Sequence, residues 1–389
     1  MKRLRLSLST AFFWSAITAC GIFYAQYDSI AYGGYYRTYL LHLPAGYDGA
    51  SDLPLIIALH GGFGNAYRIE RQSRLSAKAD AEHFIVVYPE GVRGGLLSVR
   101  SWNAGGCCGF AANAGIDDVG FINALLDTLI HTYAVDTARI YATGMSNGGY
   151  MAYRLACESA DRIAAIAPVA ASMSLNNCRP ERAVPVIDFH SYLDTHVPYN
   201  GGVGDGPSNH YNPPKDSVLN VWNNLNACLS IDTLIHNAQY TYVKWSHCNC
   251  NTEIHHYATQ DGGHSWPGGE QTPAGAPVSR YIDATDLMWT FFQQHTLACH
   301  SLSVKPGKTK NNPVDVFPNP TGGKFSVRFN NETNKFVWSI LNPEGKILFT
   351  GRSSRMDISH LPEGIYLLKI VTDDFTALKK LIKIPQNFN

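Results

Sequence analysis

A serine with the surroundings of an enzymic nucleophile stands at position 146, in the run Gly-Met-Ser-Asn-Gly of residues 144–148. This Gly-x-Ser-x-Gly pattern follows an apolar run that ends at Ala142 and precedes a helix-like stretch, so it predicts a strand-to-helix turn. Such a turn can aim a serine hydroxyl into a site, because the flanking glycines carry no side chains that would clash. The sequence therefore predicts Ser146 as the nucleophile of an acyl-transfer reaction.

A nucleophilic serine needs a base, and the base needs an acid that orients it. Asp194 follows the apolar run 184–189 and is the predicted acid. His264 is the predicted base, because it lies in the glycine-flanked segment 261–267, after the predicted strand 254–259. The competing histidines, each within a predicted strand or on the loop of Asp194, are His190, His196 and His255.

A glycine-rich turn, His-Gly-Gly-Phe-Gly-Asn at residues 60–65, follows the apolar run 55–59. Exposed backbone N–H groups in such a turn can hold the negative charge that develops on an attacked carbonyl oxygen. We predict an oxyanion hole from the N–H groups of Asn147, Gly62 and Phe63. Each donor of this kind stabilises a transition state by on the order of 3 kcal/mol.

Three aromatic residues near these motifs, Trp102, Tyr199 and Trp266, are candidates for a substrate-binding pocket. Packing in the core is an equally good explanation for each of them. Because Trp266 is close to the predicted base, we favour the pocket for this residue.

Short apolar runs without polar alternation are typical of parallel strands covered on both faces. Before residue 300 such runs occupy 55–59, 84–88, 140–142, 163–169 and 184–189. Helical patterns lie between them, at 118–133 and 147–158. This alternation predicts an α/β fold with a doubly wound, mostly parallel sheet. Asp117 and Asp118 open the first of these helices, where a capping role is expected rather than catalysis.

The C-terminal part of the chain changes character. Residues 300–313 are rich in Lys, Pro, Gly and Asn and are predicted to be a linker. Residues 314–389 then carry short runs typical of strands in a small all-β, Ig-like sandwich. These runs are 325–329, 337–341, 347–349 and 365–370.

The first residues predict export. Three basic residues among the first five precede the apolar stretch 6–24, and Ala25 offers a small residue for cleavage. We therefore predict a signal peptide over 1–25, a first domain over 26–299, and a final location outside the cell or on its surface, reached through the periplasm. The alternative is a lipobox at 17–20, in which Cys20 would carry lipid.

The charge balance argues against some partners. The chain has 31 basic and 31 acidic residues, so no field of one sign attracts nucleic acid or an anionic membrane. We expect no nucleic-acid partner and a monomeric chain.

The nine cysteines predict disulfides, since eight remain without Cys20 and the chain is exported. The predicted bridges join Cys157 to Cys178, and Cys228 to Cys248 or Cys250. Cys107 and Cys108 are left unassigned. A metal site at Cys248 and Cys250 is disfavoured, because zinc sites usually show paired two-residue spacings and none occurs here. We expect no metal and no organic cofactor.

The C-terminal region resembles the sorting domain of type IX secretion cargo. The similarity rests on Val-Phe-Pro-Asn-Pro-Thr at 316–321, Gly-Ile-Tyr at 364–366 and a Lys-rich final strand. It implies that the type IX secretion machinery is a partner. An ordinary Ig-like binding module is the alternative.

The remaining motifs occur together in the polyhydroxybutyrate depolymerase-like and feruloyl esterase proteins of carbohydrate esterase family 1, which the chain resembles over about residues 30–297. They are His-Gly-Gly at 60–62, Tyr-Pro-Glu-Gly at 88–91, Ser-Trp-Asn at 101–103 with Cys-Cys-Gly at 107–109, Asp-Asp-Val at 117–119, the serine turn at 144–148 and Gly-His-Ser-Trp-Pro-Gly at 263–268.

The resemblance implies an α/β-hydrolase fold and catalytic roles for Ser146, Asp194 and His264. One departure concerns residues 190–192, which are His-Ser-Tyr where the family usually has His-Gly-Thr. The expected function is a secreted serine carboxylesterase acting on feruloyl or acetyl esters of plant-wall polysaccharide. A polyhydroxyalkanoate depolymerase and a catalytically decayed surface-binding protein are the alternatives, and a peptidase of the same fold is less favoured.

Overall fold

The computed structural model describes residues 26–175, 177–206, 208–271, 275–297, 314–329, 336–342, 347–372 and 376–385. The chain divides into two units between Leu302 and Ser303. The predicted signal peptide, the alternative lipid site at Cys20 and the predicted linker 300–313 lie outside the described residues.

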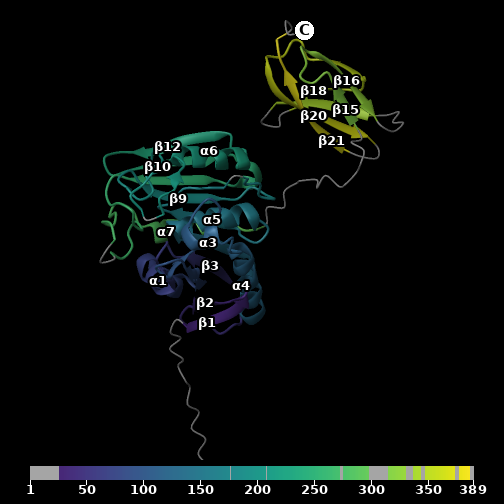
Figure 1. Cartoon of the computed structure of the whole chain (residues 1–389). Helices are drawn as coiled ribbons and strands as arrows, with labels where there is room; N and C mark the ends of the chain where they lie inside the picture. Colours follow the sequence, from purple (N-terminus) through teal and green to yellow (C-terminus); the bar gives the residue numbers. More distant parts are fainter. Residues whose placement is uncertain are drawn as a thin grey trace, which may run out of the picture. The chain divides into compact units, whose positions relative to one another are not determined.

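A ten-stranded mixed sheet forms the frame of the first unit (Figure 1). Its strands, from edge to edge, are β1 (Gln26–Tyr32), β2 (Tyr35–His42), β4 (Ile85–Pro89), β3 (Leu53–Leu59), β7 (Val135–Met145), β8 (Ala165–Val169), β9 (Val186–Ser191), β14 (Ile254–Thr259), β13 (Tyr240–Ser246) and β12 (Ser230–His236). The six central strands, β4 to β14, pair in parallel, and the outer strands pair antiparallel. The parallel centre brings the carboxyl ends of six strands to one edge.

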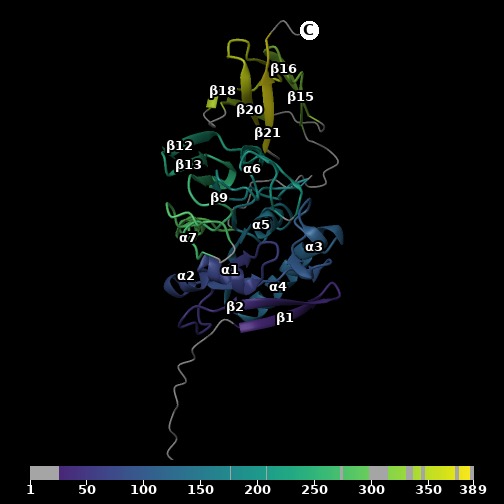
Figure 2. The same ribbon diagram turned by 60° about the vertical axis from the view of Figure 1, so that its left-hand side comes forward.

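Helices cover both faces of this sheet (Figures 1 and 2). One core contains residues of α4 (Asp118–Thr132), α5 (Asn147–Glu158) and α6 (Lys215–Asn226). The other contains residues of α1 (Ala66–Ser73), α2 (Leu75–Glu82) and α7 (Ala284–Phe292). Successive residues of a strand point to opposite faces, so a strand buried on both sides must be apolar throughout. The predicted α/β class with a doubly wound, mostly parallel sheet is confirmed.

Short elements complete the first unit. They are the hairpin of β5 (Val92–Gly94) and β6 (Val99–Ser101), the helix α3 (Gly109–Asn113), the pair β10 (Gly202–Val203) and β11 (Tyr211–Asn212), and a 3-10 turn at Asn249–Asn251. As expected, Asp117 caps α4, because its carboxylate accepts a hydrogen bond from the N–H of Gly120 at 2.9 Å.

The second unit consists of two small antiparallel sheets. One has the order β15 (Val314–Phe317), β16 (Lys324–Phe329) and β19 (Arg355–Asp357), and the other has the order β18 (Ile347–Gly351), β17 (Phe336–Leu341), β20 (Gly364–Thr372) and β21 (Thr376–Lys383). Buried residues of both sheets, such as Phe325 and Ile340, share one core. The predicted small all-β architecture is confirmed.

Three disulfides lie within the described residues. Cys157 is bonded to Cys178, as predicted, and Cys228 is bonded to Cys248, one of its two predicted partners. The third joins Cys107 to its neighbour Cys108, which the sequence left unassigned. In the described part of the chain, none of the helices combines the length and the apolar character needed to cross a membrane.

A buried charged cluster ties together the strands that precede the candidate site. Asp188 of β9 accepts hydrogen bonds from Lys215 Nζ of α6 at 2.8 Å and from the Tyr153 hydroxyl of α5 at 2.6 Å, and its other oxygen lies 2.8 Å from His256 Nδ1 of β14. All four side chains are almost fully buried. Burial alone would raise the pKa of Asp188, but Lys215 and His256 hold that pKa well below its ordinary value.

Asp188→Asn should lower the free energy of unfolding by about 3–5 kcal/mol, because Lys215 would stay buried without its counter-charge. Urea unfolding monitored by circular dichroism measures this loss. The control is Asp127→Asn, which removes the exposed partner of Arg162 and should cost less than about 1 kcal/mol. Equal, small losses in the two variants would contradict a structural role for the buried cluster.

Candidate active site

Ser146 occupies a sharp turn between β7 and α5. Its backbone has φ 54° and ψ −126°, a positive φ that non-glycine residues rarely adopt and that clusters at functional sites. The two flanking glycines make the turn possible. A Cβ at Gly144 would lie 2.6 Å from the carbonyl carbon of Gly148, and a Cβ at Gly148 would overlap the Leu59 carbonyl. The local geometry is therefore that of a nucleophile elbow.

Asp194 and His264 form a hydrogen-bonded pair on the loops that follow β9 and β14. Asp194 Oδ2 lies 2.8 Å from His264 Nδ1. The other carboxylate oxygen accepts the N–H groups of His196 and Val197, each at 2.9 Å. Burial alone would raise the pKa of Asp194, but the charge and hydrogen bond of His264 outweigh it and lower that pKa. The carboxylate thus remains ionised and fixes the orientation of the imidazole.

Ser146 and His264 line the same cavity, whose volume is about 1050 Å³. In the described part of the chain, no hydrogen bond joins Ser146 Oγ to His264. Hydrogen bonds between a nucleophile and its base often tighten only when substrate binds. The cavity is therefore lined by the predicted nucleophile and by the predicted base, which is hydrogen-bonded to the predicted acid.

Two of the three predicted oxyanion donors are available at the elbow. A Cβ at Gly61 would lie 3.4 Å from Ser146 Cβ, and one at Gly62 would lie 3.9 Å from Asn147 Cβ, so this turn packs against the elbow. Within the described residues, the N–H groups of Gly62 and Asn147 have no hydrogen-bond acceptor. Phe63 requires a correction, because its N–H donates to the Arg100 carbonyl at 3.0 Å. The free donors are therefore those of Gly62 and Asn147.

His60, at the start of the same turn, is a structural residue. Its Nε2 accepts the N–H of Gly91 at 3.0 Å, and its carbonyl accepts the Trp102 indole N–H at 2.9 Å. Burial lowers the pKa of His60 to about 4, so the ring is neutral. This network fixes the glycine-rich turn against the loop that contains Trp102.

The prediction that Trp102, Tyr199 and Trp266 bind substrate requires a correction, since none of them lines the cavity. Trp102 and Trp266 are fully buried, and the indole N–H of Trp266 donates to Thr285 Oγ1 at 3.0 Å. The Tyr199 hydroxyl lies 3.1 Å from His256 Nε2, in the buried cluster below the site. Trp102 and Trp266 therefore belong to the core, and the partly buried Tyr199 contacts the buried cluster.

Other side chains form the cavity wall. Sequence reasoning named Phe63 only for its N–H group and His196 only as a competing base, and it missed the others as site residues. The aromatic side chains of the wall are Phe63, Tyr67, Phe110 and Tyr150, and the basic ones include Arg68, His196 and His210. The only available signal was their position near the motifs, because Phe63 and Phe110 directly follow glycine-rich segments.

The competing histidines have other partners. His196 stacks on His264 with ring centroids 4.9 Å apart, and its Nδ1 pairs with Asp205 Oδ1 at 2.6 Å. His190 is buried and its Nε2 donates to the Val197 carbonyl at 2.8 Å. His255 Nε2 lies 3.0 Å from Glu253 Oε2. His190 Nε2 also lies 3.7 Å from Asp194 Oδ2, but His264 Nδ1 is the closer partner at 2.8 Å.

The departure at residues 190–192 does not distort the acid loop. Ser191, at the position of the usual glycine, has no positive φ. Its hydroxyl accepts the N–H of Leu193 at 3.1 Å and donates to the Asp261 carbonyl at 3.2 Å. A serine therefore fits here, and it links the acid loop to the loop of His264.

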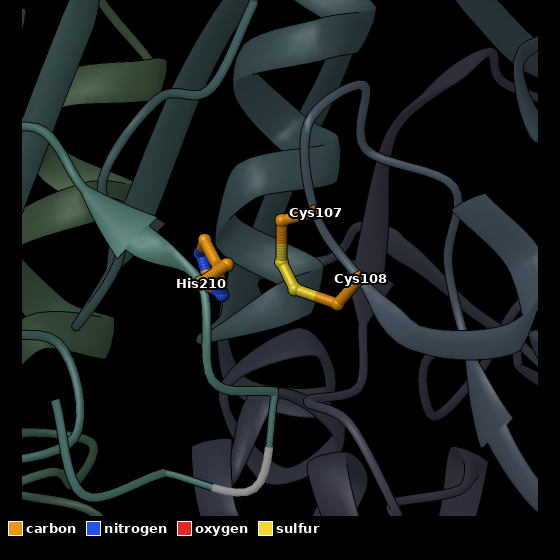
Figure 3. A group of neighbouring side chains, drawn as sticks. All are labelled: Cys107, Cys108 and His210. Atoms are coloured by element: carbon orange, nitrogen blue, oxygen red, sulfur yellow. A yellow bond between two sulfur atoms is a disulfide. The ribbon is translucent and has the colours of Figure 1, made fainter. Parts of the chain in front are cut away.

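The Cys107–Cys108 disulfide and His210 lie together at the cavity wall (Figure 3). The sulfur atoms and a ring nitrogen of His210 lie within 4.8 Å of one another. Such a set is a possible metal site only when the cysteines are thiolates. In the disulfide state the two sulfurs are bonded to each other instead.

Residues 37–179 match the family model described as esterase PHB depolymerase, and residues 315–384 match the secretion system C-terminal sorting domain. The predicted resemblance is confirmed. The sorting domain makes this a secreted or cell-surface protein.

Curated relatives agree with the PHB depolymerase match. Over 172 residues the chain is 34% identical to feruloyl esterase B of Piromyces equi, covering 43% of this chain and 31% of the relative. It is 27% identical to feruloyl esterase C of Emericella nidulans, over 66% of this chain and 83% of the relative. It is 25% identical to poly(3-hydroxyalkanoate) depolymerase C of Paucimonas lemoignei, over 69% of this chain and 59% of the relative. The chain spans about a third of the length of feruloyl esterase B.

Stability of the first unit should fall in mild acid. Burial lowers the pKa of His60, His190 and His295 to about 4 each, against 6.5 for a free histidine. Between pH 6.5 and 4 the unfolded chain therefore binds more protons than the folded chain, so the free energy of unfolding decreases as the pH falls. Urea midpoints measured from pH 7.5 to pH 4.5 should show this decrease. His295→Phe should make this decrease smaller, and the exposed His131→Gln should leave it unchanged. Urea midpoints independent of pH would refute the lowered pKa values of the three buried histidines.

Proposed function

We propose that the chain is a serine carboxylesterase that acts through an acyl-enzyme on Ser146. The observation that carries the proposal is one cavity lined by the elbow serine, by Gly62 and Asn147, and by His264, which is hydrogen-bonded to Asp194. The resemblance to esterases supports the same reaction class.

In the proposed mechanism, His264 takes the proton of Ser146 as the hydroxyl attacks an ester carbonyl. Asp194 stabilises the imidazolium, and the N–H groups of Gly62 and Asn147 hold the oxyanion. His264 then gives its proton to the departing alcohol. A water molecule, activated by the same base, hydrolyses the acyl-enzyme. None of these steps requires a metal or an organic cofactor.

The proposed substrates are feruloyl or acetyl esters of plant-wall polysaccharide. Feruloyl esterases among the relatives support this class. The size of the cavity suits an aromatic acyl group, and the exposed rings of Phe63 and Tyr67 on its wall can stack on an aromatic or sugar ring. We further propose that domain 26–299 performs catalysis as a monomer after cleavage of residues 1–25. Domain 314–389, joined to it by the linker 300–313, would engage the type IX secretion machinery.

A polyhydroxyalkanoate depolymerase is the second candidate. Leu96 and Leu97 are highly exposed at the tip of the β5–β6 hairpin, whose residues Val99 and Ser101 line the cavity. An exposed apolar tip beside a catalytic cavity suits a solid polyester surface. A catalytically decayed binding protein is less favoured, because the elbow and the acid–base pair are intact.

The test is hydrolysis of methyl ferulate, p-nitrophenyl acetate and a hydroxybutyrate oligomer by the exported chain and by Ser146→Ala. We expect wild-type activity on at least one ester and a loss of several orders of magnitude in kcat for the variant, since nothing replaces the nucleophile. Preference for methyl ferulate or p-nitrophenyl acetate supports the plant-wall class. Preference for the oligomer supports the depolymerase, and in that case Leu96→Ser with Leu97→Ser should reduce the activity on a polyester film. Equal activity of Ser146→Ala and the wild type would reject the nucleophile.

A further inference from the structure

The disulfide between Cys107 and Cys108 contacts the residue that follows the candidate nucleophile. Cys107 is buried, and its Sγ accepts a hydrogen bond from Asn147 Nδ2 at 3.7 Å. Cys108 lines the same cavity as Ser146. The bonded sulfur pair is thus part of the wall beside the oxyanion donors and not a remote cross-link.

The Asn147 carboxamide is held on both sides by the loop that ends in this disulfide. Its Oδ1 accepts the backbone N–H of Trp102 at 2.7 Å, and its Nδ2 donates to the Trp102 carbonyl at 3.0 Å. The N–H of Cys108 donates to that same carbonyl at 3.2 Å. The position of the disulfide and the orientation of Asn147 are therefore coupled through one peptide unit.

The disulfide also sets the position of α3, which forms another part of the wall. Cys108 is the N-terminal cap residue of α3. The helix carries Phe110, whose ring lines the cavity and packs so closely over Gly94 that a Cβ there would overlap it. A shift of the cysteines would therefore reach both Asn147 and the part of the cavity wall formed by Phe110.

The surroundings of the pair would have to change on reduction. Bonded sulfurs are about 2.0 Å apart, whereas two thiols must separate to about 3.5 Å or more. With Cys107 only 1% exposed, there is little room for this separation without displacing Asn147 or the loop. On the other side, His210 Nε2 is buried and has no hydrogen-bond partner among the described residues, so it could accept a thiol S–H. The reduced state therefore has a partner available that draws a sulfur away from Asn147.

We propose that the Cys107–Cys108 disulfide positions the oxyanion hole through Asn147, so that its reduction lowers turnover. The inference rests on the proposed esterase function. In the reduction, a small dithiol such as dithiothreitol transfers two electrons and two protons: the Cys107–Cys108 bond breaks, two thiols form, and the dithiol closes to its own disulfide. Reoxidation restores the bond.

The experiment compares the exported chain in its disulfide and dithiothreitol-reduced states, with mass spectrometry to identify which cysteines are reduced. Reduction of Cys107 and Cys108 should lower kcat roughly tenfold or more, a larger factor than any rise in KM, because the oxyanion donors act on the transition state whereas Phe110 only lines the cavity. The inhibition constant of a boronic acid, which mimics the tetrahedral intermediate, should rise in parallel. Activity should return on reoxidation.

Matched variants separate positioning from general stability. Cys107→Ser with Cys108→Ser should have the low kcat of the reduced chain and no further response to dithiothreitol. Cys157→Ser with Cys178→Ser removes a different disulfide of the same unit. It should lower the melting temperature, keep the wild-type kcat and still lose activity on reduction. A fully active chain with verified free Cys107 and Cys108 thiols would overturn the proposal.

The amide resonance of Asn147, in protein labelled selectively with ¹⁵N-asparagine, provides a readout that does not depend on activity. We expect it to shift on reduction and to return on reoxidation. An unchanged resonance in the reduced state overturns the positioning role whether or not the chain hydrolyses esters. Failure of the disulfide form to cleave any ester, with the resonance still shifting, would reject the esterase function alone.

Discussion

The close packing of the serine elbow against the end of β3 constrains everything else at the site. Gly148 approaches the Leu59 carbonyl so closely that no side chain fits between them, and Gly144 approaches Gly148 in the same way. This contact gives Ser146 its positive φ and places the start of α5 beside the turn of Gly62. The strain of one residue is offset by the packing of the two central strands, which lie in the best-buried part of the sheet.

The parallel centre of the sheet then delivers the remaining groups to the same edge. The loops after β9 and β14 carry Asp194 and His264, and those strands are neighbours paired in register. Beneath them, the cluster around Asp188 ties β9 and β14 to α5 and α6. Buried charge of this kind is costly to assemble but fixes the relative positions of its partners once all are satisfied. It lies directly under the two loops whose mutual geometry the acid–base pair requires.

Sequence reasoning predicted the parts of the site that depend on backbone topology. The elbow, the acid loop and the histidine loop each follow a predicted strand. The strand before the histidine loop ends at Thr259 as predicted, whereas β7 and β9 continue to Met145 and Ser191, beyond the predicted ends at Ala142 and Phe189. Sequence reasoning failed where a residue's role depends on the direction of its side chain or on which acceptor its N–H group contacts. Trp102 and Trp266 point into the core, and the Phe63 amide is taken by the Arg100 carbonyl. Such outcomes depend on contacts between segments distant in sequence, which no local pattern records.

Covalent labelling of the nucleophile tests the central claim most directly. A fluorophosphonate should react with the exported chain at a single site, and peptide mapping should find the adduct on Ser146. His264→Ala should slow the labelling by orders of magnitude, because the serine would lose its base. An adduct on another residue, or labelling of Ser146 at the same rate without His264, would contradict the assigned catalytic apparatus.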